Sequence, residues 1–144
     1  MVTESQRIVY LSHRDKSVEH HRHGRNDEMK FVHLCTGADG ESHFRDVEVE
    51  MKGAGNRGQR SELMKATGIF FSVTGADYDL DWHNAPRRQF VITLEGEVEI
   101  TASDGMKRRF GPGDIMLADD TTGRGHISRA VNNRPRKAIF VTLD

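Results

Sequence analysis

The side chains best suited to chemistry near the start of this sequence are histidines in a polar stretch between residues 12 and 30. Imidazoles bind metal ions and phosphate groups in many proteins. Here, however, they alternate with basic and acidic residues and almost no apolar ones, so the stretch cannot contribute to a core. We interpret residues 1–30 as an N-terminal strand followed by a solvated arm, whose histidines are His13, His20, His21 and His23.

Two further pairs have the residue types of a nucleophile and its base. Cys35 follows His33 by two residues, so a strand would place both side chains on one face. No third residue that would orient the histidine is apparent, and we predict a buried structural thiol. Ser128 follows His126 by two residues but lacks the Gly-x-Ser-x-Gly turn of hydrolases. Because Cys35 is the only cysteine, an intramolecular disulfide and a cysteine-rich zinc site are excluded.

A glycine pattern, Gly53-x-Gly55-x-x-Gly58, matches the fingerprint of dinucleotide-binding proteins. That fingerprint works only where the last glycine opens a full helix inside a parallel sheet. The residues that follow, Gln59 to Ala66, are the only stretch of helix-friendly composition, and eight residues make about two turns. We therefore interpret the glycine pattern as a flexible loop.

Three aspartates at alternate positions, Asp77, Asp79 and Asp81, resemble the start of a calcium-binding loop. Trp82 stands where such a loop needs glycine, which excludes that interpretation. The alternation of acidic and apolar residues is instead typical of a strand with one polar face. We expect Asp81 and His83 to share that face.

The apolar residues of the rest of the chain come in short runs separated by turn signals such as Gly-Pro-Gly-Asp at residues 111–114. The runs have the length of strands rather than helices, and their spacing is typical of an all-β sandwich or barrel. In the clearest unit, residues 88–102, two alternating runs flank Glu95-Gly96 and predict a β-hairpin. We predict one domain over residues 31–144.

Composition limits the partners and the compartment. The 21 Lys and Arg residues are matched by 22 Asp and Glu residues, so no global field attracts nucleic acid or an anionic membrane. Neither a signal peptide nor a membrane-spanning apolar run is apparent, and we expect a cytoplasmic protein.

The order of features between Asp79 and Arg129 resembles the cupin family. A strand with His83, a turn at Pro86, the Glu95-Gly96 turn, the Gly-Pro-Gly-Asp turn and a strand with His126 follow one another. The resemblance implies a double-stranded β-helix jelly-roll barrel. It covers the last half of the chain closely and residues 31–73 more loosely.

The first cupin motif reads G-(x)5-H-x-H-(x)3-4-E-(x)6-G. With Gly96 as its last glycine, His83 keeps one ligand position, whereas Ala85 and Gln89 replace the second histidine and the glutamate. The second motif reads G-(x)5-P-x-G-(x)2-H-(x)3-N. Its histidine is His126, two extra residues separate its glycines, and Asp119 and Ala130 replace the proline and the asparagine.

The resemblance implies two kinds of site. One is a polar pocket for a small molecule, with an anionic ligand favoured by the arginine fork at the turn; its residues are His83, Arg87, Gln89, His126 and Ser128. The other is a divalent metal site for Fe, Mn, Ni or Zn on His83, Gln89 and His126, with Asp81 as a further carboxylate. Because the acidic ligand is replaced, we favour the metal-free alternative.

Three functions follow. The first is a small-molecule-binding cupin without redox chemistry, which we favour. The second is a metal-dependent cupin enzyme, an oxygenase or an isomerase. The third is an interaction module that uses the polar arm of residues 12–30. The family resemblance also makes a homodimer the expected assembly.

Overall fold

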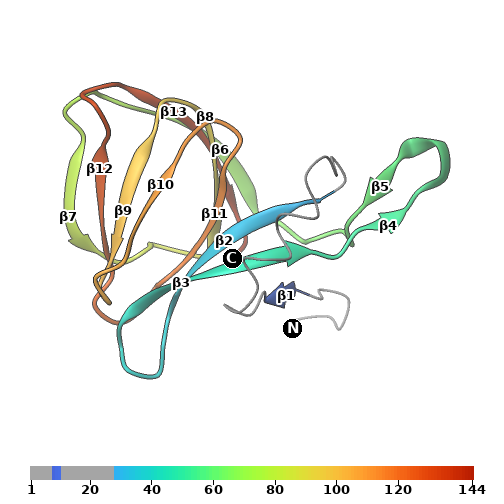
Figure 1. The fold of residues 1–144 in the computed structure, drawn as a ribbon, viewed down its shortest axis with the longest axis horizontal. Helices are drawn as coiled ribbons and strands as arrows, with labels where there is room; N and C mark the ends of the chain where they lie inside the picture. Colours follow the sequence, from blue (N-terminus) through green and yellow to red (C-terminus); the bar gives the residue numbers. More distant parts are fainter. Residues whose placement is uncertain (1–7, 11–27) are drawn as a thin grey trace, which may run out of the picture. The chain divides into compact units, whose positions relative to one another are not determined.

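The computed structural model describes residues 8–10 and 28–144. It contains almost only strands, which confirms the all-β prediction (Figure 1). In chain order the elements are β1 (Ile8–Tyr10), β2 (Lys30–Thr36), β3 (Ser42–Val49), β4 (Lys52–Gly53), the 3-10 helix η2 (Gly55–Arg57), β5 (Gln59–Arg60), β6 (Gly68–Thr74), β7 (Asp79–His83), β8 (Gln89–Glu95), β9 (Val98–Ala102), β10 (Lys107–Phe110), β11 (Ile115–Asp119), β12 (His126–Ala130) and β13 (Arg136–Thr142).

The chain divides into two compact units, and the described residues of the first are 8–10, 28–31 and 46–64. Residues 46–64, which the sequence assigns to the barrel, thus group with residues 8–10 and 28–31. In this unit β1 pairs antiparallel with the end of β3, and β4 pairs with β5. The chain reverses through Gly55 and Gly58, both at positive φ, and returns as β5. Residues 59–66, the stretch of helix-friendly composition, therefore form no helix: Gln59–Arg60 is β5, and residues 61–66 have no regular secondary structure. Residues 11–27, most of the predicted polar arm, lie outside the described residues.

The second unit comprises Val32–Arg45 and Lys65–Asp144 and forms a two-sheet jelly roll. One sheet has the strand order β3-β2-β11-β8-β13-β6, and the other has the order β10-β9-β12-β7 (Figure 1). Strands β6, β8, β11 and β13 belong to the larger sheet and β7, β9, β10 and β12 to the smaller one, so the chain crosses repeatedly between the sheets in the manner of two Greek keys. This order confirms the predicted double-stranded β-helix.

The predicted hairpin at residues 88–102 is wrong in its pairing although both strands exist. Strand β8 pairs with β11 and β13, whereas β9 pairs with β10 and β12 in the opposite sheet. Gly96, at φ 73°, therefore turns the chain from one sheet to the other. A hairpin and a crossing between sheets share the same local pattern of alternation and turn, so the sequence did not distinguish them.

The core of the second unit lies between the inner faces of the two sheets. Alternating residues of β8 and β9 point inward, in keeping with the period of a strand. The buried apolar cluster is made of Leu34, Phe44, Ala85, Val91, Val98, Ile100, Ala102, Phe110, Met116, Ala118 and Ala138.

Strand β6 is an edge strand of the larger sheet and carries exposed apolar side chains at Ile69, Phe71 and Val73. The homodimer stays a prediction.

Across residues 8–10 and 28–144, no helix has the length and apolar character needed to cross a membrane.

Candidate functional site

A cavity of about 240 Å³ lies inside the jelly roll of the second unit. All five predicted ligand-binding residues line it, although they come from β7, the following turn, β8 and β12. The lining residues are Phe70, Tyr78, Leu80, His83, Ala85, Pro86, Arg87, Gln89, Val91, Val98, Ile100, Met116, Ala118, His126, Ser128, Arg136 and Phe140. Apolar walls with a few polar groups are typical of small-molecule sites.

Two histidines face each other across neighbouring strands. His83 of β7 pairs in register with His126 of β12, and their ring centroids are 4.3 Å apart at an interplanar angle of 59°. A β-bulge follows, because Ser128 pairs with Leu80, so that two residues of β7 oppose one of β12.

This bulge overturns the expectation that Asp81 joins the site. By simple alternation Asp81 shares a face with His83 and Leu80 lies opposite. The extra residue breaks the alternation, so that both His83 and Leu80 line the cavity while the side chain of Asp81 is exposed. Asp81 contributes its main-chain carbonyl oxygen instead, which lies 2.7 Å from Nδ1 of His83.

A glycine permits the close approach of the two histidine strands. Gly125, just before β12, has φ 76°, a conformation that other residues rarely adopt. A Cβ atom there would lie 2.2 Å from the carbonyl oxygen of His83. Only glycine at this position therefore allows the histidine pair to form.

His126 is held by a buried carboxylate. Its Nδ1 atom lies 2.6 Å from Oδ2 of Asp120, which is fully buried. Because a carboxylate accepts, Nδ1 of His126 donates this hydrogen bond and carries a proton. Nε2 forms no hydrogen bond with any described residue, so it is available to a ligand.

His83 is also held through its Nδ1 atom, but by a different partner. Its Nδ1 atom donates to the carbonyl oxygen of Asp81, which also leaves Nε2 available. Burial lowers the pKa of His83, and the neighbouring His126 lowers it further. A neutral His83 therefore presents a lone pair on Nε2, which accepts a hydrogen bond from a hydroxyl or amine.

The other predicted residues differ in exposure. Gln89 and Ser128 are buried, and the Oε1 atom of Gln89 is buried without a hydrogen-bond partner among the described residues. A buried acceptor without a partner costs about 1–3 kcal/mol, which favours a ligand that donates to it. Arg87 is exposed and lines the cavity from the turn between β7 and β8.

Two residues of the site were missed by the sequence analysis. Asp120 follows the strand β11 and orients His126, and Arg136 begins β13 and lines the cavity. A signal for Arg136 existed, since Arg136, Ala138 and Phe140 alternate along one strand face. A strand that begins at residue 136 places this arginine on the inner face with Ala138.

The residues at the predicted metal site fit a divalent cation poorly. Among residues 8–10 and 28–144, no group of three or more His, Cys, Asp or Glu side chains is arranged to hold a metal ion. The predicted set consists of two imidazoles and the amide of Gln89, which carry no negative charge, and Asp81 lies outside the cavity. Such a neutral set binds first-row divalent metals weakly.

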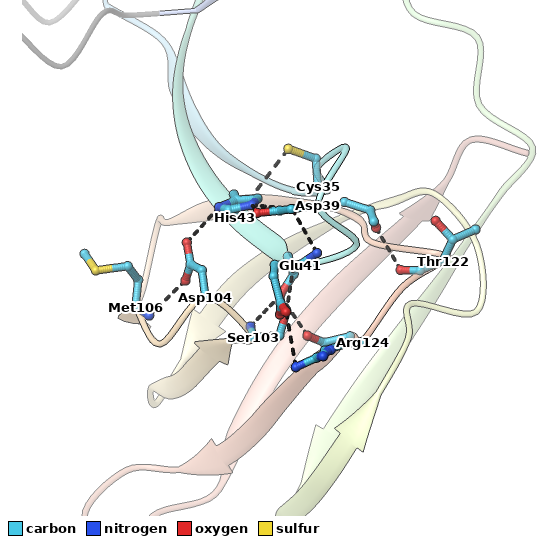
Figure 2. Close-up of polar contacts among 12 residues, drawn as sticks. Cys35, Asp39, Glu41, His43, Ser103, Asp104, Met106, Thr122 and Arg124 are labelled. Carbon is cyan, nitrogen blue, oxygen red and sulfur yellow. Dashed lines mark hydrogen bonds and ion pairs between the residues drawn. The ribbon is translucent and has the colours of Figure 1, made fainter.

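A second polar cluster surrounds the turn between β2 and β3 (Figure 2). His43 lies between two carboxylates, with Nδ1 2.9 Å from Asp104 and Nε2 3.0 Å from Asp39. Cys35 is buried beside it and donates weakly to the carbonyl oxygen of His43. Burial raises the pKa of the Cys35 thiol, in keeping with a structural rather than a nucleophilic cysteine.

Comparisons with known proteins concern the fold. No family model and no curated protein matches the sequence. Solved structures similar to this chain include the cupin domain of Schizosaccharomyces pombe Cnp3, at 12% identity over 82% of this chain and 85% of that one, with a TM-score of 0.44.

Two bacterial structures are also similar. Conserved protein SPY1581 of unknown function from Streptococcus pyogenes is 19% identical, covering 58% of this chain and 69% of its own, with a TM-score of 0.44. Protein NMB1881 from Neisseria meningitidis is 17% identical, covering 58% and 81%, with a TM-score of 0.43. The cupin-like fold of this chain rests on its own strand order, described above.

Proposed function

We propose that this protein binds a small organic molecule in the cavity of its cupin-like jelly roll, without redox chemistry. One observation carries the proposal: His83 and His126 are both fixed through Nδ1, which leaves both Nε2 atoms available beside one apolar cavity. A purely structural histidine needs no such free nitrogen. Gln89, with its unpartnered Oε1 atom, adds a third group that lacks a protein partner.

The size of the cavity limits the ligand. An engineered apolar cavity of about 150 Å³ holds benzene. By that scale the cavity of about 240 Å³ accepts a molecule of about ten non-hydrogen atoms. The exposed Arg87 at its edge favours a ligand with a negative charge.

Calorimetric titration with small aromatic alcohols and acids, beginning with 2-phenylethanol and phenylacetate, tests this function. We expect saturable one-to-one binding to the wild type. His83→Phe removes the Nε2 acceptor while keeping a ring, and we expect it to weaken 2-phenylethanol binding about threefold to tenfold, the worth of one net hydrogen bond.

His43→Gln is the matched control. Like His83, His43 is a histidine held by hydrogen bonds, in its case to two carboxylates, but it does not line the cavity. We expect it to bind both probes as the wild type does. Binding that His43→Gln weakens and His83→Phe leaves unchanged would contradict the proposal, as would a wild type that binds neither probe.

A metal-dependent oxygenase or isomerase is the alternative. It requires near-stoichiometric Fe, Mn, Ni or Zn, which elemental analysis of untagged protein measures. Because the donors of the cavity are neutral, we expect well below one metal ion per chain.

A further inference from the structure

Arg136 is a buried arginine in the wall of the cavity. It is the first residue of β13, and its exposed fraction is 7%. Its side chain shares the inner strand face with Ala138 and Phe140, both of which are in or against the core. The sequence therefore places a guanidinium where an apolar residue is usual.

The partners of Arg136 do not neutralise it. Nη2 donates to the hydroxyl oxygen of Thr93 across 3.2 Å, and Nε is buried without a hydrogen-bond partner among the described residues. No carboxylate of residues 8–10 and 28–144 forms an ion pair with it. Burial lowers the pKa of the Arg136 guanidinium, yet arginine remains charged in proteins.

Two exposed arginines of the same unit, in contrast, form ion pairs with carboxylates. Arg129 pairs with Asp79 at 2.8 Å, and Arg124 pairs with Glu41 at 3.2 Å. Exposed pairs of this kind contribute little, whereas a buried charge without a counter-charge is costly. At Arg136, where a carboxylate is most needed, the described part of the chain thus supplies none.

Arg136 lies at the opposite end of the cavity from the histidine pair. Gln89 begins β8 opposite Ala118 of β11, two residues before the Asp120 that holds His126. Thr93, the partner of Arg136, comes four residues later in β8. Four residues of a strand span about 13 Å. Between these two ends the wall is apolar and includes Val91, Ile100 and Phe140.

The main chain at Arg136 packs closely against Gly96. A Cβ atom on Gly96 would lie 2.3 Å from the carbonyl oxygen of Pro135 and 3.1 Å from Cα of Arg136. The turn between the sheets therefore packs directly on the start of β13. Burial and the hydrogen bond to Thr93 restrict the guanidinium before any ligand arrives, which reduces the entropy lost on binding.

We propose that Arg136 is the anion-binding group of this cavity, and that the ligand is a small monocarboxylate whose apolar body lies between Arg136 and the His83–His126 pair. This inference rests on the function proposed above. One guanidinium offsets one negative charge, so a dianionic phosphate would leave a charge uncompensated in an apolar cavity. The planar guanidinium also matches a carboxylate, to which it donates two parallel hydrogen bonds.

The experiment compares phenylacetate with 2-phenylethanol, which has the same apolar body and no charge, by calorimetric titration at neutral pH. We expect the wild type to bind phenylacetate at least tenfold more tightly. Arg136→Met should remove that preference and leave the affinity for 2-phenylethanol within about twofold. Arg134→Gln is the matched control, because Arg134 is exposed and does not line the cavity, and it should behave as the wild type.

The melting temperature of the ligand-free proteins is a second readout. If Arg136 had a structural role, Arg136→Met would lower the melting temperature. Because the buried charge lacks a counter-charge, we expect Arg136→Met to be as stable as the wild type or more stable. Thr93→Val tests the same inference without removing the charge. Since it deletes the hydroxyl group that holds Nη2, it should weaken phenylacetate binding and spare 2-phenylethanol.

The outcomes separate the two proposals. Equal affinities for the two probes in the wild type, or a preference for phenylacetate that survives both Arg136→Met and Thr93→Val, would overturn the inference and leave the binding function standing. A wild type that binds neither probe would overturn both.

Discussion

Asp120 and His126 form the most buried polar contact of the site, with Oδ2 of the aspartate 2.6 Å from Nδ1 of the histidine. The two residues are six positions apart. Asp120 directly follows β11 and His126 begins β12, and these two strands belong to different sheets. Their contact therefore joins the two layers at the cavity and fixes the orientation of the imidazole. It also determines that Nε2, rather than Nδ1, is presented to a ligand.

Asp120→Ala should lower the free energy of unfolding by about 1–3 kcal/mol, because it leaves the buried Nδ1 donor of His126 without an acceptor. Asp120→Asn retains an acceptor oxygen and should lose less. Urea denaturation followed by tryptophan fluorescence measures both values. Asp81→Asn, at an exposed carboxylate near the same histidines, should be neutral; an equal loss there would show that burial of Asp120 is not the cause.

Gly125→Ala should be more destabilising than Gly105→Ala. Both glycines have positive φ, so each substitution incurs about 1–2 kcal/mol of backbone strain. Nothing lies within 4 Å of a Cβ atom on Gly105, whereas one on Gly125 collides with the main chain at His83. We expect a further loss of roughly 1–3 kcal/mol for Gly125→Ala in denaturant unfolding. Equal losses would mean that the two strands do not approach as described.

The cluster around His43 predicts a pH-dependent stability. Hydrogen bonds to Asp39 and Asp104 raise the pKa of His43 in the folded protein. The free energy of unfolding that His43 contributes is therefore fully present below its unfolded pKa of about 6.5, and it is lost as the pH rises through the higher pKa of the folded protein. Denaturation midpoints measured across neutral pH should show this loss in the wild type and not in His43→Gln.

The same cluster also predicts a loss of stability at low pH. Hydrogen bonds from His43 and from the main chain lower the pKa of Asp39 in the folded protein. The stability that Asp39 contributes is therefore fully present above its unfolded pKa, and it is lost as the pH falls through the lower pKa of the folded protein. The stability that Asp39→Asn removes should thus disappear in strong acid. A difference between wild type and Asp39→Asn that persists there would contradict the assignment.

Cys35 should react slowly with thiol reagents. It is buried, and burial raises its pKa, so little thiolate is present at neutral pH. We expect labelling by 5,5′-dithiobis(2-nitrobenzoate) to be at least tenfold slower in the folded protein than in urea. Labelling at the rate of the unfolded chain would indicate an accessible, activated thiol instead.

Much of the fold is visible in the sequence, because strand length, alternation and turn residues are local properties. The alternation at residues 89–95 and 98–102 identified two strands, but the choice of partner strands depends on the whole sheet order. That is why the predicted hairpin is in fact a crossing between sheets.

The site shows the same division. The family resemblance pointed to His83, Gln89 and His126, which do line one cavity. Asp81 was misplaced because a bulge in the pairing with β12 leaves no sequence signal. Asp120 was missed because its role depends on a contact between two sheets, and Arg136 because a charged residue at the start of a strand usually faces solvent.

The central claim is that the cavity around His83 and His126 is a binding site for a small molecule. Its most direct test is a titration of ¹⁵N-labelled protein with phenylacetate, monitored by the backbone amide resonances. We predict saturable shifts at the inner residues of β8, β12 and β13, including Gln89, His126 and Arg136, and none around His43. Shifts confined to the β2–β3 turn, or no saturable shift at all, would contradict the claim.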